Sequence, residues 1–369
     1  MGKVACINPK TNIPDNFKYV DLESVVGTSL IKAKLTTKQL APSRAKRVAK
    51  KGDIFYQTVR PYQKNNFLFD INNYDFQYVF STGYAQLRSE INNYFLFSYL
   101  QRQRFVNLIL RRSTGTSYPA ISSKDLSEIK IIFPRNSKEQ ENIGKIINLI
   151  DALITLQQRK LEQLMQLKKA MLQQLFVDKN NKQPNLRFKN FKGDWEQHRL
   201  EEVAQVTMGQ SPSSKNYTDN PNDYVLVQGN ADLKSNEISP RVWTKEVTKQ
   251  VHKGEFIMTV RAPVGYLAMA NMDAVIGRGV AAIDGNKYLY YLLQTKLLDR
   301  TWEKLSSGST FESISSNDIK NLEIKVTENE EEKLIAKLMD TVTCLLTLQQ
   351  SKIDQLTILK RYLLQKLFI

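Results

Sequence analysis

The chain has 369 residues, of which 41% are hydrophobic and 24% are charged, and its formal net charge is +16. This composition is typical of a folded globular protein, and the length suggests two or three domains. No apolar run reaches the roughly 18 residues of a membrane span, and no signal peptide opens the sequence, so we expect a cytoplasmic protein without a membrane partner. Cys6 and Cys344 are flanked by apolar residues and are expected to be buried, reduced thiols.

The positive charge is concentrated in the first third of the chain. Residues 1–138 hold 22 Lys and Arg against 9 Asp and Glu, whereas residues 194–330 hold 15 against 19. A basic domain favours a polyanion partner, either nucleic acid or an anionic surface. The later domain is slightly acidic, so it could bind nucleic acid only through a local basic face.

In chain order, the first predicted strand is DIFYQTV, an apolar and β-branched run after Gly52. Residues 93–110 show the apolar spacing of a helix, and the polar loop 111–123 follows. Residues 129–134, IKIIFP, are predicted to form another strand, which Pro134 ends.

Residues 139–176 form the next predicted element, a long amphipathic helix. Its apolar residues recur at alternating spacings of three and four, the pattern of a coiled-coil seam. The seam is interrupted by Gln157 and Lys168. The polar linker VDKNNKQPNLRFKNFKGDW, residues 177–195, is long enough for the chain to reverse its direction.

The second half of the chain repeats this order. Segment 155–176 shares 13 of 22 residues with segment 347–368, at a separation of 192 residues. The matching runs farther upstream are KVACI with EVAQV, GDIFYQTVRP with GEFIMTVRAP, and GTSYPAISSKDLSEIKI with GSTFESISSNDIKNLEI. The second helix, 331–368, is interrupted at Gln349 and Lys360, the counterparts of the two interruptions in the first. The first copy has no counterpart of GDWEQHR, which precedes the second.

Shared interruptions suggest that the two helices recognise each other, because a polar seam residue fixes register and partner. We therefore predict an α+β protein in which two similar globular domains are joined by two long antiparallel helices, a coiled-coil spacer, as a pseudo-two-fold dumbbell. The predicted parts are 1–138 (first recognition domain), 139–176 (helical spacer), 177–193 (linker), 194–330 (second recognition domain) and 331–369 (helical spacer). The candidate residues for the seam and for subunit docking are Ile150, Gln157, Leu164, Val342, Gln349 and Leu356.

Catalytic signals are weak throughout the sequence. The two histidines, His198 and His252, lack metal-ligand spacing, and no GxxxxGK[ST] loop is present. Glu128-Ile129-Lys130 and Glu323-Ile324-Lys325 match half of a nuclease motif, but they do not align between the copies. We interpret them as solvent-facing charges on edge strands and predict a non-catalytic chain that holds no metal and no cofactor.

Binding signals are stronger. The basic segment 32–53 is predicted to follow phosphates, and the polar loops 111–123, 209–217 and 306–316 suit phosphate or base contacts, although a solubilising face and ordinary turns would look alike. Arg60 and Arg261, each after a predicted strand, could read guanine or could pair with a carboxylate. The candidate DNA-binding residues are Lys46, Arg47, Lys50, Lys51, Arg60, Tyr62, Lys64, Arg112, Ser113, Thr116, Tyr118, Ser211, Ser213, Ser214, Lys215, Arg261, Arg278, Ser309 and Thr310.

The repeated motifs resemble those of the specificity subunit of type I restriction-modification systems. The matching features are the P-x-L-R-F-x-x-F-x-G-x-W-E run at 184–196, the G-x-x-x-x-x-I-S-x-x-D-[LI] run in each copy, and the two Q-[RS]-K-[LI]-[ED]-Q-L helices. They cover nearly the whole length in the order of that family.

The resemblance implies a DNA-binding subunit without catalysis of its own. Each domain would read half of a split, asymmetric target in double-stranded DNA, and the helices would set the gap and dock two methyltransferase subunits. Those subunits would bring S-adenosylmethionine, and motor-nuclease subunits would bring ATP and Mg²⁺. Two other interpretations stay open: a freestanding DNA-binding regulator or architectural protein, and a scaffold whose basic face meets an acidic protein.

Overall fold

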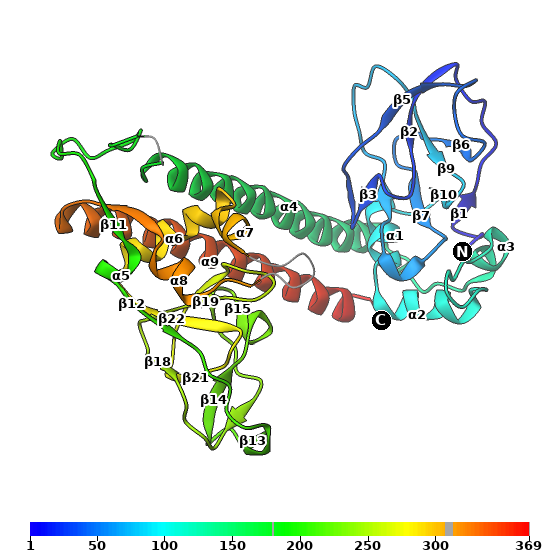
Figure 1. Ribbon diagram of the computed structural model, residues 1–369. Coiled ribbons are helices and arrows are strands. Elements are labelled where there is room, and N and C mark those ends of the chain that lie inside the picture. The colour runs from blue at the N-terminus through cyan, green and yellow to red at the C-terminus, as the bar shows by residue number, and fades with distance from the viewer. Residues whose placement is uncertain (179–180, 307–312, 369) are drawn as a thin grey trace. The chain divides into compact units, whose positions relative to one another are not determined.

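The computed structural model describes residues 1–178, 181–306 and 313–368, and the chain divides into two compact units. Unit 1 comprises Met1–Arg159 and Gln350–Ile369, and unit 2 comprises Lys160–Gln349. Two helices, α4 (Ser137–Gln174) and α9 (Asn329–Lys366), each begin in one unit and end in the other (Figure 1). Both units combine sheets with helices, so the predicted α+β class is confirmed.

Unit 1 is built on two four-stranded sheets. Its strands are β1 (Ala5–Ile7), β2 (Asn16–Val20), β3 (Val25–Val26), β4 (Ser29–Leu30), β5 (Lys34–Thr37), β6 (Ala45–Val48), β7 (Ile54–Gln57), β8 (Phe67–Leu68), β9 (Tyr78–Ser81) and β10 (Tyr84–Ser89). One sheet has the order β1-β10-β7-β8, the other has the order β5-β2-β9-β6, and β3 pairs with β4. All four residues of β7 are buried, which explains why the DIFYQTV run is apolar without alternation.

Short helices accompany these sheets. They are η1 (Pro61–Gln63), α1 (Asn93–Leu100), α2 (Gln103–Arg112) and α3 (Ser123–Glu128). The predicted single helix over 93–110 is therefore two helices. Arg102 leaves the helical conformation, with ψ at 138°, and caps the start of α2.

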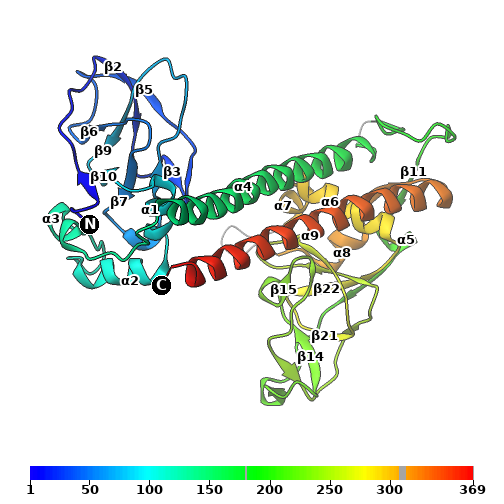
Figure 2. The same cartoon turned by 180° about the vertical axis from the view of Figure 1, so that it is seen from behind.

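Unit 2 contains a six-stranded and a five-stranded sheet, which Figure 2 shows from behind. Its strands are β11 (Glu196–Arg199), β12 (Gln205–Met208), β13 (Tyr217–Thr218), β14 (Tyr224–Val227), β15 (Leu233–Lys234), β16 (Glu237–Ile238), β17 (Trp243–Thr244), β18 (Gln250–Val251), β19 (Phe256–Thr259), β20 (Leu267–Met269), β21 (Ala274–Ile276), β22 (Val280–Asp284) and β23 (Glu323–Val326). The sheet orders are β12-β22-β19-β20-β16-β15 and β13-β17-β14-β21-β18, and β11 pairs with β23.

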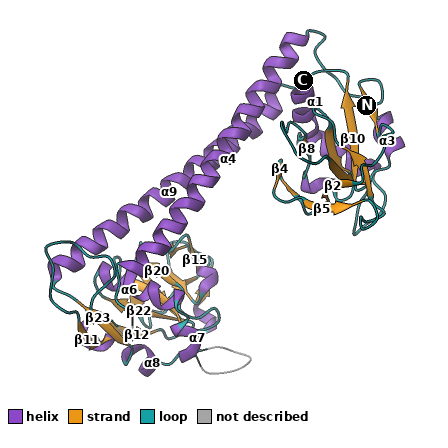
Figure 3. Cartoon of the chain, turned by 90° about the horizontal axis from the view of Figure 1, so that it is seen from above, coloured by secondary structure: helices purple, strands orange, loops and turns teal. Residues whose placement is uncertain are grey.

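Short helices of unit 2 lie both between its strands and after β22. They are α5 (Leu200–Val203), η2 (Ser214–Asn216), η3 (Asn230–Asp232), α6 (Lys287–Leu298), α7 (Thr301–Leu305) and α8 (Ser316–Lys320). Figure 3 distinguishes the strands and helices of this unit by colour. Tyr288 and Leu292 of α6 and Trp302 of α7 join the core that β19 and β22 also supply.

The two units share one strand framework. In unit 1, β10 pairs antiparallel with β7, and Tyr84 lies opposite Gln57. In unit 2, β22 pairs antiparallel with β19, and Val280 lies opposite Thr259. The residues that follow β7 and β19 make matching hydrogen bonds. Thr58 N–H donates to Gly83 O, and Val260 N–H donates to Gly279 O, both at 2.9 Å. This register aligns the two units residue by residue.

Within each unit the two long helices run antiparallel, as predicted. In unit 1, Ile143 of α4 shares a core with Leu364 and Leu367 at the other end of α9, and Asp151 pairs with Lys360 at 2.5 Å. In unit 2, Leu172 near the end of α4 shares a core with Ile335 near the start of α9. The helices begin and end two residues before the predicted bounds.

Three predictions about local structure are wrong. Residues 129–134 do not form a strand. The equivalent segment of unit 2, β23, is a strand that pairs with β11. Glu128 accordingly ends helix α3, whereas Glu323 does lie on a strand.

The third error concerns the thiols. Both Cys6 and Cys344 are free but exposed. Cys6 is at the outward-facing middle position of β1, between buried Ala5 and half-buried Ile7. Cys344 follows the buried seam residue Val342 by two positions and therefore lies on another side of α9. Flanking apolar residues did not indicate burial because alternate positions of a strand face opposite sides.

Candidate nucleic-acid interface

The basic segment of unit 1 covers β5, β6 and the turn before β7. Lys46, Lys50 and Lys51 are exposed there, as predicted for side chains that could reach phosphates. Lys51 is already engaged, because its ammonium donates to Asn72 Oδ1 at 2.6 Å and lies 3.7 Å from Asp70. Arg47 is half-buried, and burial lowers its pKa.

A buried carboxylate anchors this turn. Asp53 accepts the Lys50 backbone N–H at 2.9 Å and a bidentate pair of bonds from Arg88, both at 2.9 Å. Gln86 donates to the same carboxylate at 2.7 Å. The exposed lysines therefore project from a backbone that is tied to strand β10.

A second exposed cluster follows β7. Arg60 has a left-handed backbone (φ 55°) and its guanidinium stacks 4.3 Å above the ring of Tyr118, which is itself exposed. Tyr62 is exposed nearby on η1. Lys64 is half-buried, and burial followed by the charges of Lys360 and Arg361 lowers its pKa.

The remaining candidates of unit 1 lie at the end of α2 and on the loop that follows it. Arg112 and Thr116 are exposed. Ser113 is half-buried, and its hydroxyl donates to Ile109 O at 3.0 Å at the end of α2. The Ser113 hydroxyl proton is thus used within the fold.

The predicted equivalence of Arg60 and Arg261 is wrong by one residue. Val59 forms an antiparallel bridge with Ala120, and Arg261 forms the matching bridge with Ser313. Arg261 therefore occupies the position of Val59, and Arg60 is one residue farther along. The ungapped alignment of GDIFYQTVRP with GEFIMTVRAP also places Val59 against Arg261, and a shift of one residue moves a side chain to the other face of a strand.

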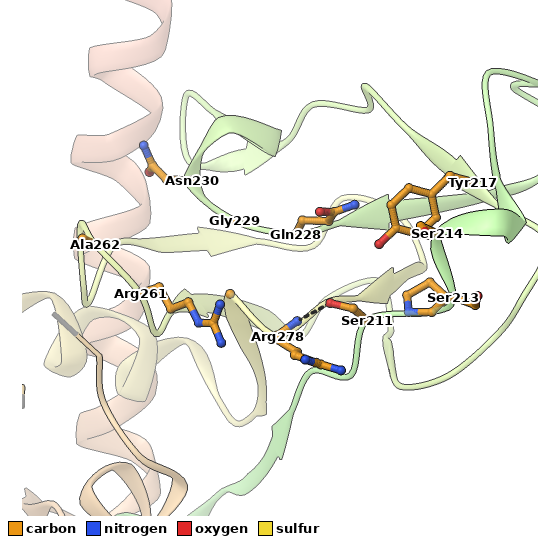
Figure 4. Close-up of a pocket in the computed structure, with 12 residues that line it drawn as sticks. Ser211, Ser213, Ser214, Tyr217, Gln228, Gly229, Asn230, Arg261, Ala262 and Arg278 are labelled. Carbon is orange, nitrogen blue, oxygen red and sulfur yellow. Dashed lines mark hydrogen bonds between the residues drawn. The ribbon is translucent and has the colours of Figure 1, made fainter. Parts of the chain in front are cut away.

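Five of the candidate residues of unit 2 line one cavity of about 600 Å³, shown in Figure 4: Ser211, Ser213, Ser214, Arg261 and Arg278. Its lining residues are Ser211, Pro212, Ser213, Ser214, Tyr217, Gln228, Gly229, Asn230, Arg261, Ala262, Arg278 and Gly279. Lys215 neighbours these residues on η2 but does not line the cavity. Ser309 and Thr310 lie outside the described residues.

Sequence reasoning missed Tyr217, Gln228 and Asn230 as cavity residues. Gln228 follows β14, which pairs in parallel with β21, and this non-local pairing brings it beside Arg278. The sequence indicated this loop only through Gly229, which ends the apolar run of β14.

All six seam candidates are buried or half-buried. Ile150, Val342 and Gln349 are buried, and Gln157, Leu164 and Leu356 are half-buried. Lys168 is half-buried over the ring of Tyr291 at 5.6 Å. Burial lowers the pKa of Lys168, and the charge of Asp340 opposes that shift.

Each helix also carries a second, exposed apolar stripe. On α4 it consists of Ile146, Leu149, Leu153 and Leu156, which are between 43% and 63% exposed. On α9 the repeat places Leu345 and Leu348 at the positions of Leu153 and Leu156. The spacing of three and four puts each set on one face of its helix.

Among the residues that the structure describes, no group of His, Cys, Asp and Glu side chains could hold a metal ion. His198 instead lies 3.1 Å from Glu202 and 3.4 Å from Glu196. In the described part of the chain, no helix combines the length and the apolar character that a membrane crossing requires.

Comparisons with known proteins agree on one family. A family model described as the type I restriction modification DNA specificity domain matches residues 8–166 and again residues 192–357. A Methanocaldococcus jannaschii protein assigned as the MjaX type I restriction enzyme specificity subunit is 28% identical over 294 residues, 76% of this chain and 68% of that protein. The HindI specificity subunit of Haemophilus influenzae is 27% identical over 173 residues, 45% of this chain and 37% of that protein.

Solved structures give the same result. A chain described in work on complex assembly and conformational transition of the type I R-M system is 27% identical, with a TM-score of 0.61, and the match covers 100% of this chain and 96% of that one. The type I restriction-modification S subunit from M. genitalium has a TM-score of 0.67 at 16% identity, over 100% of this chain and 94% of that one, which is a likeness of fold.

Proposed function

Because this chain belongs to the type I restriction-modification DNA specificity family, we propose that each of its units reads one half of a split, asymmetric target in double-stranded DNA. The observation that carries the proposal is that one strand framework presents two different surfaces. Unit 1 presents Val59 and the Arg60–Tyr118 stack where unit 2 presents Arg261 beside its polar cavity. Equivalent frameworks with different contact residues suit two different half-sites.

We further propose that the two long helices dock two methyltransferase subunits and set the distance between the half-sites. The exposed apolar stripes support this role, because the seam uses another face of each helix and leaves the stripes open to solvent. Burying an exposed leucine against a partner stabilises a complex by about 1.5–3 kcal/mol. The repeat of the stripe on α4 and α9 matches two copies of one partner.

The catalytic steps then belong to the partners. The methyltransferase subunits would bind S-adenosylmethionine, and the motor-nuclease subunits would bind ATP and Mg²⁺. The assembly would act in the cytoplasm, where its DNA lies. The chain would contribute sequence recognition and no reacting group.

Exchanging part of unit 2 tests whether each unit reads its own half-site independently. Residues 196–307 are replaced by the equivalent segment of a relative, and methylated sites are mapped in a host that expresses the complete system. One half of the methylated sequence should change, and the half read by residues 1–114 should stay the same. A chimera in which both halves change together would contradict independent reading.

Binding by the chain alone provides the second test. Electrophoretic shifts against DNA are compared with and without the methyltransferase subunit. Sequence-specific binding should require, or be greatly strengthened by, that subunit. Equally tight and specific binding by the isolated chain would instead indicate a freestanding DNA-binding regulator.

A further inference from the structure

We propose that Arg261 and Arg278 together form a clamp for one backbone phosphate of the half-site that unit 2 reads. This inference rests on the proposed DNA-reading function and assigns a ligand group within it. The clamp would fix the register of unit 2 on the DNA, and unit 1 has no equivalent.

The pairing of β19 with β22 brings the two arginines to one cavity. Thr259 lies opposite Val280, and the Val260 N–H bond to Gly279 O continues this pairing by one step. Arg261 follows Val260 and bridges to Ser313, whereas Arg278 lies in a turn that the Val280 N–H bond to Gly277 O closes at 3.2 Å. Both arginines line the cavity, where their like charges repel each other.

Among the described residues, no Asp or Glu lines the cavity that both arginines share. Within residues 1–178, 181–306 and 313–368, neither guanidinium has an ion-pair partner, although Asp232 nearby pairs with Arg241 at 3.9 Å. Both arginines are exposed, so an anion can reach them.

The backbone that carries Arg278 is held in place. Its N–H donates to Ser211 Oγ at 3.1 Å, and the N–H of Gly277 donates to Val227 O at 2.8 Å. A Cβ at Gly279 would lie 2.0 Å from Gln228 O, so only glycine permits this close approach. A side chain that starts from a fixed backbone loses less freedom when it binds.

The charge of the ligand decides between a phosphate and a base edge. Two guanidinium groups in one cavity favour a ligand with a formal negative charge, which a phosphate carries and a guanine edge does not. Hydroxyls of Ser213 and Ser214 line the same cavity and are suitable donors to further phosphate oxygens.

Unit 1 shows what the same framework looks like without the clamp. Tyr84 lies opposite Gln57, so the positions that match Arg278 and Arg261 are Thr82 and Val59. Neither side chain is charged. Unit 1 therefore depends on its exposed lysines and on Arg60 for phosphate contacts.

The test compares two double variants in the complex with methyltransferase subunits. Arg261→Gln with Arg278→Gln removes both charges, and Arg261→Lys with Arg278→Lys retains them. The probe is one duplex taken from a random-sequence library that the wild-type complex has selected. For the double Gln variant (the Gln pair) we expect weaker binding to DNA. A plot of the logarithm of its binding constant against the logarithm of the salt concentration should have a slope smaller by about 1, because one fewer phosphate is neutralised. The Lys pair should keep the wild-type slope.

Selection from the same library gives the second readout. The preferred sequence of the Gln pair should equal that of wild type, and equal thermal midpoints of the two double variants show that both are folded. An unchanged salt slope for the Gln pair would overturn the clamp. Loss of preference for guanine at one position would also overturn it, because the arginines would then read a base. A wild-type complex that selects no sequence would contradict the proposed function itself.

Discussion

Arg187 and Glu331, 144 residues apart in sequence, form a buried bidentate ion pair in unit 2. Arg187 Nε donates to Oε1 and a terminal nitrogen donates to Oε2, both at 2.8 Å. The Trp195 indole N–H donates to the same carboxylate at 3.2 Å. The pair attaches the segment before β11 to the first turn of α9. Two residues of the P-x-L-R-F-x-x-F-x-G-x-W-E run thus have a structural role.

Removing Arg187 should destabilise the protein strongly. Arg187→Ala leaves Glu331 buried without its cationic partner, and loss of one member of a buried pair costs about 3–5 kcal/mol. Chemical unfolding at pH 7 measures the difference. The double variant Arg187→Met with Glu331→Leu should recover most of the loss, because it leaves no unpaired charge. A double variant as unstable as Arg187→Ala would show that packing, and not charge, dominates.

The contribution of this pair should depend on pH. Burial opposes ionisation of Glu331, yet its bonds with Arg187 hold the pKa of the carboxyl below the ordinary value of 4.5. A depressed carboxyl pKa stabilises the folded state above the unfolded pKa, and this stability is lost as the pH falls through the folded pKa. The difference in unfolding free energy between wild type and Arg187→Ala should therefore be smaller at pH 3 than at pH 7. A constant difference would contradict this assignment.

Neighbouring residues of α4 separate the seam from the exposed stripe. Ile150 is 7% exposed and Leu149 is 63% exposed. Ile150→Ala should cost about 2–5 kcal/mol, because it removes buried methyl groups and leaves a cavity. Leu149→Ala should change the unfolding free energy by less than about 0.5 kcal/mol. Equal losses from both variants would mean that the seam is not the stabilising face.

The stripe should instead govern subunit docking. Leu153→Asp with Leu156→Asp should leave the unfolding midpoint unchanged and remove one methyltransferase subunit from the complex, because a charge would have to be buried at the interface. Leu345→Asp with Leu348→Asp on α9 is the matched pair and should remove the other subunit. The mass of the purified complex reports the number of subunits. A complex of unchanged mass would place the docking surface elsewhere.

Charges of the basic segment should contribute unequally to DNA binding. Lys46→Gln with Lys50→Gln should weaken binding to all sequences and make the salt slope shallower, because exposed lysines release counterions from DNA. Lys51→Gln should have less effect, since Lys51 already pairs with Asp70. Replacing the half-buried Arg47 should lower the unfolding free energy of the protein. If the slope stays the same in Lys46→Gln with Lys50→Gln, the segment only keeps the protein soluble.

Local periodicity and internal repetition in the sequence were sufficient to predict much of the fold of this protein. The duplicated segments predicted the α+β class, the strands at Ile54–Gln57 and Phe256–Thr259, and two long antiparallel helices. These features depend on side-chain spacing along one element, which a sequence records directly. The motifs also indicated the family, because two copies in one order are much more specific than any single run.

Tertiary structure decided everything that depends on pairing between distant segments. Residues 129–134 have strand-like composition but form no strand, whereas the equivalent segment β23 pairs with β11. Arg261 matches Val59, and not Arg60, because bridges to Ala120 and Ser313 set the register. A register is the joint property of two strands, and a shift of one residue reverses every side chain. The convergence of Arg261 and Arg278 on one cavity arises from such a pairing, which neither segment specifies alone.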